Sequence, residues 1–301
     1  MFTIKHIQNK DSNLNYIELK DSSGSSRAII SLNLGGSLQE LTLKNNSIIK
    51  DLHPLNYDKS FASAILFPFA GRIRNGSYTY KEKKYRLAIN NSDENSVLHG
   101  LVYNKIFSVV EKKSSSTQAE VKLAYTEKNK TQGFPYKYNI QLHYTLTIDT
   151  IDLTVTIKNN DIISFPFCVG WHPYFHSEDL YNSYIRLKSD EKLSFDDKMI
   201  PVEIKKIITE KDLKIKDRKF DDCYILNSNY ICFKTPSYSV KLSSSSEENY
   251  LQVYTPSKRN TVAIEPITGP SNNFNNKIGL KILDSEDTYN VNWTIKLKEN
   301  E

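Results

Sequence analysis

Residues 170–176, GWHPYFH, place a side chain that can transfer protons among aromatic rings. His172 stands directly before Pro173, and a proline disfavours the α-helical region for the residue that precedes it. We therefore expect His172 in extended or turn backbone. Flat aromatic faces suit a sugar ring, which has apolar C–H faces and a polar edge, and here they are supplied by Trp171, Tyr174 and Phe175. Alone, the stretch slightly favours the alternative, a hydrogen-bonded histidine at a strand corner.

A carboxylate inside an apolar stretch is the second chemical candidate. Glu265 follows residues 262–264 (VAI) and precedes Pro266, so its side chain reaches solvent only with difficulty. Burial disfavours the ionised form of a carboxyl group and raises its pKa above the usual value of about 4.3. A carboxyl group perturbed in this way favours a role as a general base.

Three further polar residues are candidates for ligand binding. Arg72 lies in residues 67–76 (FPFAGRIRNG) among small and apolar neighbours, and a partly buried guanidinium needs partners. A bound ligand and a structural ion pair explain it equally well. His99 stands before Gly100 at a predicted loop, where a histidine is more often structural than functional. Asp221 belongs to an Asp-Asp pair beside aromatic residues, and such pairs usually serve as capping or turn devices.

Alternation of apolar and polar residues, typical of strands with one buried face, recurs along the chain. It predicts a hairpin over residues 138–157 with its turn at 149–152, a second hairpin over 77–87, and strands at 121–125 and 289–297. Many short strands with no helices between them favour an all-β fold, a large antiparallel β-sandwich. The charged residues 203–219 are expected to hold the one short helix, and residues 1–301 to form a single domain.

The composition excludes several classes of protein. With 39% hydrophobic residues, 19 Tyr and 13 Phe among 301 residues, a sizeable core is expected and disorder is not. The 40 basic and 35 acidic residues give a net charge of +5 without a basic stripe, so nucleic acid is not indicated. Three scattered cysteines fit neither a disulfide framework nor a zinc site, and no metal is expected. No apolar run is long enough to span a bilayer and no apolar stretch opens the chain, which predicts a cytoplasmic protein without a membrane partner.

Taken in order, these stretches resemble the motifs of the aldose 1-epimerase (galactose mutarotase) family. Each motif is weak by itself, but the ordered set is specific and covers the chain from about its first third to its C-terminal strand. The matching stretches are RIRNG at 72–76 with the Tyr-rich hairpin after it, LHG at 98–100, QGFPY at 132–136, GWHPYF at 170–175, FDD at 220–222, YTP at 254–256 and EPITGP at 265–270.

The resemblance implies a galactose mutarotase-like supersandwich with an open cleft and no cofactor. It implies that Glu265 is the base at the anomeric hydroxyl of a hexose and that His172 is the acid at the ring oxygen. The other sugar contacts that it implies are His99 near the ring, Arg72 and Asp221 at sugar hydroxyls, and Tyr174 on the same wall. The expected partner is a free aldohexose, and the protein is expected to be a monomer or a weak dimer.

Three positions depart from the family pattern. Gly71 stands where the family often has an asparagine before the arginine, and Leu101 where many members have a second glycine. Phe107 occupies a position where an aromatic residue, commonly tryptophan, is expected. The implied catalytic pair is intact, so these departures bear on the preference among sugars.

The implied chemistry needs only one base and one acid, which open the hemiacetal and reclose it on its other face. Each such proton transfer typically contributes on the order of 10²- to 10⁴-fold to the rate. The sequence carries no phosphate-cradling glycine loop and no Cys-x-x-Cys pair, so it indicates neither a nucleotide nor a metal.

Three alternatives share parts of this pattern. A non-catalytic carbohydrate-binding module would also use a sandwich and an aromatic wall, but it does not call for a buried carboxylate together with a histidine. A glycoside hydrolase normally needs two carboxylates about 5–10 Å apart, and only Glu265 and Asp221 are available. A hexose-6-phosphate mutarotase needs convergent arginines, and Arg74, on the same strand face as Arg72, is its strongest support. One dedicated arginine is a weak phosphate site, so a neutral sugar is preferred.

Overall fold

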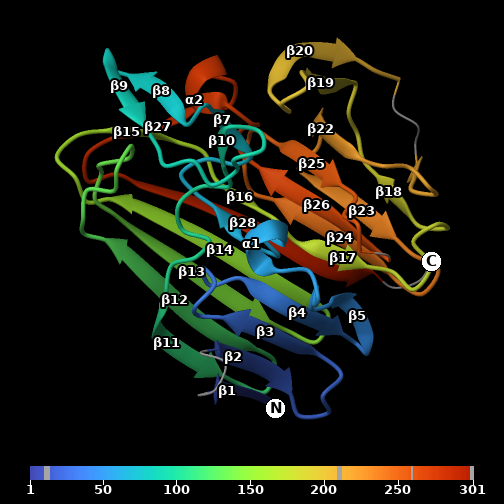
Figure 1. Cartoon of the computed structure of the whole chain (residues 1–301). Coiled ribbons are helices and arrows are strands. Elements are labelled where there is room, and N and C mark those ends of the chain that lie inside the picture. Colours follow the sequence, from blue (N-terminus) through green and yellow to red (C-terminus); the bar gives the residue numbers. More distant parts are fainter. Residues whose placement is uncertain (10–13, 209–211, 259, 299–301) are drawn as a thin grey trace.

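Antiparallel strands make up nearly all of the regular structure in the computed structural model, which describes residues 1–9, 14–208, 212–258 and 260–298 (Figure 1). Most of these strands belong to three sheets. The largest has nine strands in the order β11 (Ser108–Ser114), β12 (Ala119–Glu127), β13 (Tyr138–Leu146), β14 (Thr150–Asn159), β28 (Thr288–Lys298), β24 (Ser239–Ser244), β23 (Tyr230–Lys234), β18 (Tyr184–Arg186) and β21 (Leu213–Lys214).

The second sheet has eight strands and carries most of the chemical candidates. Its order is β20 (Pro201–Lys206), β19 (Glu191–Phe195), β22 (Asp221–Ile225), β25 (Tyr250–Tyr254), β26 (Thr261–Ile267), β16 (Gly170–Trp171) and β6 (Ile65–Leu66), and β17 (Tyr174–His176) also pairs with β26. The strand order therefore brings residues from the middle of the chain next to residues near its C-terminal end.

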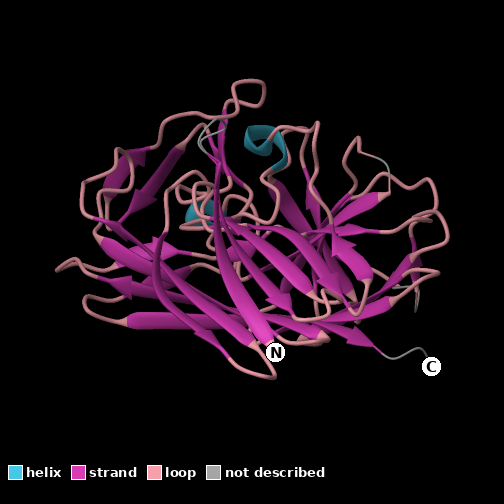
Figure 2. Ribbon diagram, turned by 90° about the horizontal axis from the view of Figure 1, so that it is seen from below, coloured by secondary structure: helices cyan, strands magenta, loops and turns pink. Residues whose placement is uncertain are grey.

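The remaining strands form a five-stranded N-terminal sheet and three short pairs. The N-terminal sheet runs β1 (Phe2–Asn9), β2 (Leu14–Asp21), β3 (Arg27–Ser31), β4 (Leu38–Leu43) and β5 (Asn46–Ile49). The pairs are β7 (Arg72–Arg74) with β10 (Ser96–Leu98), β8 (Ser77–Tyr80) with β9 (Lys83–Arg86), and β15 (Phe165–Phe167) with β27 (Lys281–Leu283). The two helices of the described residues are single turns, α1 (Tyr57–Ser60) and α2 (Asn273–Asn276), set in loops (Figure 2).

Apolar faces packed between sheets form the core. Along β13 every second side chain is buried, from Tyr138 to Leu146, and the side chains between them are partly or fully exposed. The rings of Trp171 on β16 and Trp293 on β28 stack with centroids 6.3 Å apart and join the eight-stranded sheet to the nine-stranded one. Removal of these faces from water drives the packing. The predicted all-β, antiparallel sandwich is confirmed.

Two predictions of local structure are wrong. The hairpin β13–β14 turns at residues 147–149 rather than 149–152, because Thr150 and its two successors already pair with β28. Residues 203–219 contain strands β20 and β21 where the structure describes them, and residues 209–211 lie outside the described residues. Three of the charges that favoured a helix, those of Glu203, Lys205 and Lys206, lie on β20 at the edge of its sheet, where charged side chains discourage pairing with other chains.

Candidate active site

All six residues singled out from the sequence line one cleft of about 150 Å³: Arg72, His99, His172, Tyr174, Asp221 and Glu265. An engineered protein cavity of about 150 Å³ holds one benzene molecule. The cleft therefore matches a single six-membered ring in size.

Three neighbouring strands project polar side chains into the cleft from one face of the eight-stranded sheet. Gln252 on β25 lies opposite Glu265 on β26, and Asp221 on β22 lies opposite Tyr254 on β25. Side chains two residues apart on a strand share a face, so these four side chains point the same way. The register of the sheet, rather than any local motif, assembles this part of the site.

His172 occupies the link between β16 and β17, in non-helical backbone as Pro173 predicts. Its carbonyl accepts a hydrogen bond from the N–H of Ser63 at 2.8 Å, and its own N–H donates to Ala64 at 3.1 Å. The ring of Tyr174 stacks on the imidazole with centroids 4.9 Å apart, and the Tyr174 hydroxyl donates to the carbonyl of Ser60 at 2.9 Å. These contacts fix the backbone at His172 and hold the ring of Tyr174 against its imidazole.

His172 and Glu265 form a buried pair. His172 Nε2 lies 3.3 Å from Glu265 Oε1, and the two side chains are 5% and 4% exposed. Burial lowers the pKa of His172 to about 4. Burial, and then the negative charge of Asp221, raise the pKa of Glu265 well above its usual value, while the positive charge of Arg72 opposes them. Both directions favour the uncharged forms, so we assign one proton to the pair.

His99 stands directly after β10 and presents its ring to the pair. Its backbone is left-handed (φ 59°), and its N–H donates to the carbonyl of Gly71 at 2.8 Å. The imidazole meets the His172 ring edge-on at 5.0 Å between centroids. Burial, followed by the charges of His172 and Arg72, lowers its pKa well below the usual value. His99 Nδ1 is buried and has no hydrogen-bond partner among the described residues, so a ligand can supply one.

Gly100 is required by the packing beside His99. Its φ is +79°, and a Cβ there would lie 2.3 Å from the carbonyl oxygen of Phe67. No residue with a side chain fits this position without moving the backbone. Gly100 therefore allows the chain to pack against Phe67 directly after His99, which holds the histidine in its position.

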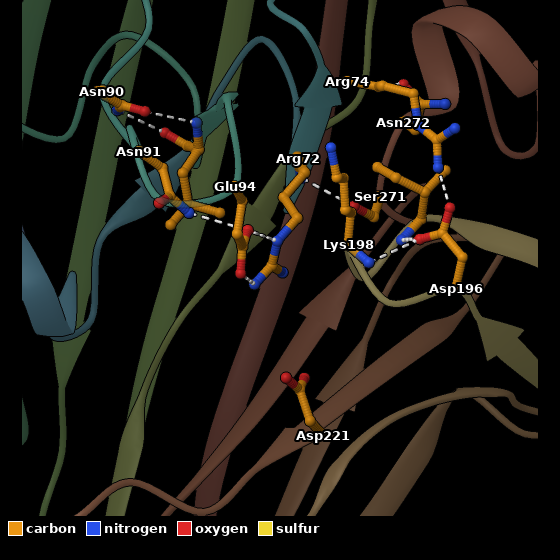
Figure 3. A network of polar contacts seen from close by, with 12 residues as sticks. Arg72, Arg74, Asn90, Asn91, Glu94, Asp196, Lys198, Asp221, Ser271 and Asn272 are labelled. Carbon is orange, nitrogen blue, oxygen red and sulfur yellow. Dashed lines mark hydrogen bonds and ion pairs between the residues drawn. The ribbon is translucent and has the colours of Figure 1, made fainter.

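Arg72 forms the structural ion pair that the sequence allowed, and it also lines the cleft. Its guanidinium lines the cleft and also forms a two-pronged ion pair with Glu94, with Nε–Oε2 at 2.5 Å and Nη2–Oε1 at 2.9 Å (Figure 3). Its backbone N–H donates to Ser271 Oγ at 2.9 Å.

Asp221 accepts a hydrogen bond from Gln252 Nε2 at 2.6 Å, and burial raises the pKa of the Asp221 carboxyl.

Arg74 does not line the cleft beside Arg72. It is half-exposed and forms an ion pair with Asp196, in the loop between β19 and β20 (Figure 3). Strand geometry alone allowed Arg74 to reach the cleft, but a carboxylate from another part of the chain binds it outside.

Several cleft residues were missed by sequence reasoning: Lys59, Phe61, Phe195, Met199, Gln252 and Tyr254. Tyr254 belongs to the YTP stretch that matches the family, but the sequence alone predicted no role for it in the site. Gln252 is identified only by its register with Glu265, and Phe195 and Met199 come from the β19–β20 hairpin, whose approach to the cleft depends on tertiary packing.

Within the described ranges, no three His, Cys, Asp or Glu side chains lie close enough together to hold a metal ion. The three cysteines form no disulfide. No helix among the residues that the structure describes could span a membrane.

Comparison with known proteins decides the family. The aldose 1-epimerase family model matches residues 16–296. The chain belongs to the aldose 1-epimerase family. It is 25% identical over 277 residues to the uncharacterized protein YihR of Escherichia coli K12, with 87% of each chain covered. It is 26% identical over 148 residues to galactose mutarotase of Bos taurus, which covers 47% of this chain and 41% of the relative.

Solved structures with a similar fold include a galactose mutarotase-like protein. A galactose mutarotase-like protein from Clostridium acetobutylicum superposes with a TM-score of 0.88 at 21% identity and covers 99% of both chains. At this identity the likeness shows the fold alone. The galactose mutarotase-like architecture expected from the motifs is confirmed.

Proposed function

We propose that this protein is a mutarotase, which interconverts the α and β anomers of a hexose by acid/base opening and reclosure of the ring. The observation that carries the proposal is the buried contact between His172 and Glu265 in a cleft sized for one ring. Membership of the aldose 1-epimerase family, and the name of the bovine relative, support the same reaction.

The proposed reaction moves one proton within the pair. The carboxylate of Glu265 takes the proton of the anomeric hydroxyl while protonated His172 gives its proton to the ring oxygen. The C1–O5 bond breaks, the C1 carbonyl forms, and rotation about C1–C2 presents the other face. Reclosure returns the proton from Glu265 to O1 and the O5 proton to His172. Because O1 and O5 are bonded to the same carbon, an acid and a base that are neighbours can serve both atoms.

The surroundings of the pair favour this exchange. Before opening, the pair is a carboxylate and an imidazolium; after opening, it is a carboxylic acid and a neutral imidazole, so the count of protons is constant. Burial favours the second state. The positive charge of Arg72 favours the first, because it lowers the pKa of Glu265. These opposing effects bring the two states closer in free energy, as a reversible proton transfer requires.

A neutral aldohexose is the proposed substrate. Arg72 and Arg74, the two arginines that could receive a phosphate, each already bind a carboxylate, Glu94 and Asp196. Lys59 lies at the cleft and forms no ion pair within the described part of the chain, so a 6-phosphate would meet a single uncommitted cation there. A phosphate group is normally held by several convergent donors.

The test is the rate at which freshly dissolved α-glucose, α-galactose and α-glucose 6-phosphate reach anomeric equilibrium, followed by polarimetry or by NMR. The proposal expects acceleration proportional to enzyme concentration, larger for the neutral sugars. Sugar binding without acceleration would favour the carbohydrate-binding alternative. A faster reaction with the phosphate that is lost in Arg74→Ala would favour the hexose-6-phosphate mutarotase.

A further inference from the structure

The loop between β9 and β10 carries a carboxylate that aligns the cleft arginine. Glu94 binds Arg72 through both of its oxygens, at 2.5 Å and 2.9 Å. Asn91 Nδ2 donates to Glu94 Oε2 at 2.9 Å, which fixes the carboxylate in turn. A two-pronged contact sets the plane of a guanidinium as well as its place. Glu94 uses two of the five N–H donors of Arg72, so three remain for a ligand.

A second carboxylate, that of Asp221, lies close enough to the same guanidinium to interact with its charge. Figure 3 shows Glu94 on one side of Arg72 and Asp221 on another. The charge of Arg72 opposes the rise that burial causes in the pKa of Asp221, yet the two side chains form no ion pair. Asp221 instead accepts from Gln252. An Arg72–Asp221 contact would use groups from both sides of the cleft and close the space between them.

We propose that Glu94 is a positioning residue, which holds the guanidinium of Arg72 away from Asp221 so that both groups remain available to sugar hydroxyls. This inference rests on the proposed mutarotase function. Glu94 acts through Arg72 and does not touch the sugar. Its loop is held against β10, because Asn90 Oδ1 accepts a hydrogen bond from the N–H of Leu98 at 2.7 Å and Asn90 Nδ2 donates to the Leu98 carbonyl at 3.0 Å.

The test compares Glu94→Gln and Glu94→Asp with a matched control. The control is Glu18→Gln, because Glu18 pairs with Arg27 at 2.6 Å on the N-terminal sheet, away from the cleft residues. We expect Glu94→Gln to lower kcat/KM about 10- to 100-fold, mainly through KM, as misplaced binding groups do. Glu94→Asp keeps the charge but has a shorter reach, and we expect a smaller loss. Glu18→Gln is expected to leave both constants unchanged.

The pH profile separates positioning from a merely structural role. In Glu94→Gln, Arg72 moves toward Asp221 and Glu265, so its charge lowers the pKa of Glu265 further. The alkaline limb of kcat/KM then shifts to lower pH. The other ionisable groups that face Glu265 stay in place: His172 before β17, Tyr174 on β17, Asp221 and Cys223 on β22, Tyr254 on β25, and His99 after β10.

Two kinetic results would overturn the inference. One is a folded Glu94→Gln protein with wild-type KM and an unshifted alkaline limb; the other is an equal loss in Glu18→Gln. If Glu94→Gln does not fold, the same comparison is made with Glu94→Asp. A wild-type protein inactive on every aldose would refute the proposed function instead. In that case the position of Arg72 is read from its Nε–H resonance in ¹⁵N-labelled protein. We expect this N–H to be protected from exchange in wild type and unprotected in Glu94→Gln. An unchanged resonance contradicts the inference.

Discussion

Replacement of Glu265 by glutamine preserves the shape of the side chain and removes the proposed proton acceptor. Because the carboxylate takes part in both opening and reclosure in the proposed reaction, we expect the enzymatic rate to fall by about 10²- to 10⁴-fold, the usual contribution of one such group. The stability of the folded variant, by contrast, should rise. The buried carboxyl of Glu265 has a raised pKa, so ionisation opposes the folded state, and a neutral amide carries no such penalty.

The sign of the stability effect depends on pH. Below the unfolded-state pKa, close to the usual 4.5, the carboxyl is protonated in both states and ionisation costs the fold nothing. As pH rises from there to the folded-state pKa, the unfolded chain ionises and the wild-type protein loses stability. The glutamine variant does not, so its advantage grows over this window and is constant above it. Single stabilising substitutions commonly gain about 0.5–2 kcal/mol.

The assay joins polarimetry with thermal unfolding at pH 5 and pH 8. We expect Glu265→Gln to be slow at both pH values. Its melting temperature should exceed that of wild type by more at pH 8 than at pH 5. Wild-type rates in a folded Glu265→Gln protein would refute its role as the base. A variant less stable than wild type at pH 8 would refute the assignment of a raised pKa.

Three other predictions follow from the site. His172→Asn should lose the reaction to a similar degree with the fold retained, as measured by polarimetry and circular dichroism; wild-type rates would remove it from the mechanism. The profile of kcat/KM against pH should be bell-shaped, because the proposed reaction needs one proton on the pair. The acidic limb should lie near the His172 pKa of about 4, and the alkaline limb above the usual range of glutamate pKa values. A profile that is flat above pH 5 would contradict the single-proton assignment. Arg72→Ala and Asp221→Ala should weaken sugar binding in calorimetric titrations by roughly 1.5–3 kcal/mol, the usual value of a charge-assisted hydrogen bond, whereas unchanged affinity in a folded Asp221→Ala protein would exclude that residue from the site.

The fold was predictable where one strand carries its own signal. Strand β13 alternates buried side chains with partly or fully exposed ones over its whole length, and β28 does so over most of its length. Two-residue strands such as β6 and β16 have no such signal, because they exist only through pairing with neighbours distant in sequence. The charged β20 resembled a surface helix for the same reason: its partner β19, rather than its own residues, makes it a strand.

The residues of the candidate site were likewise predictable only where the local sequence carries a signal. His172 and Glu265 were recognisable because each has a proline beside it and apolar neighbours, which restrict backbone and solvent access. Gln252 has no local signal, since only the register with β26 turns it to the cleft. Glu94 lies in a polar loop 22 residues after Arg72, and nothing in the spacing pairs them. Sequence thus identified the residues with unusual surroundings and missed those that a distant partner places at the cleft.

Exchange NMR on equilibrated galactose and glucose tests most directly whether this protein interconverts anomers. The proposed reaction predicts cross-peaks between the α and β anomeric protons that grow with enzyme concentration, while the ratio of the two anomers stays unchanged. They should be absent at the same mixing time without protein and in His172→Asn. Sugar that binds the wild-type protein but shows no enzyme-dependent exchange would contradict the proposal.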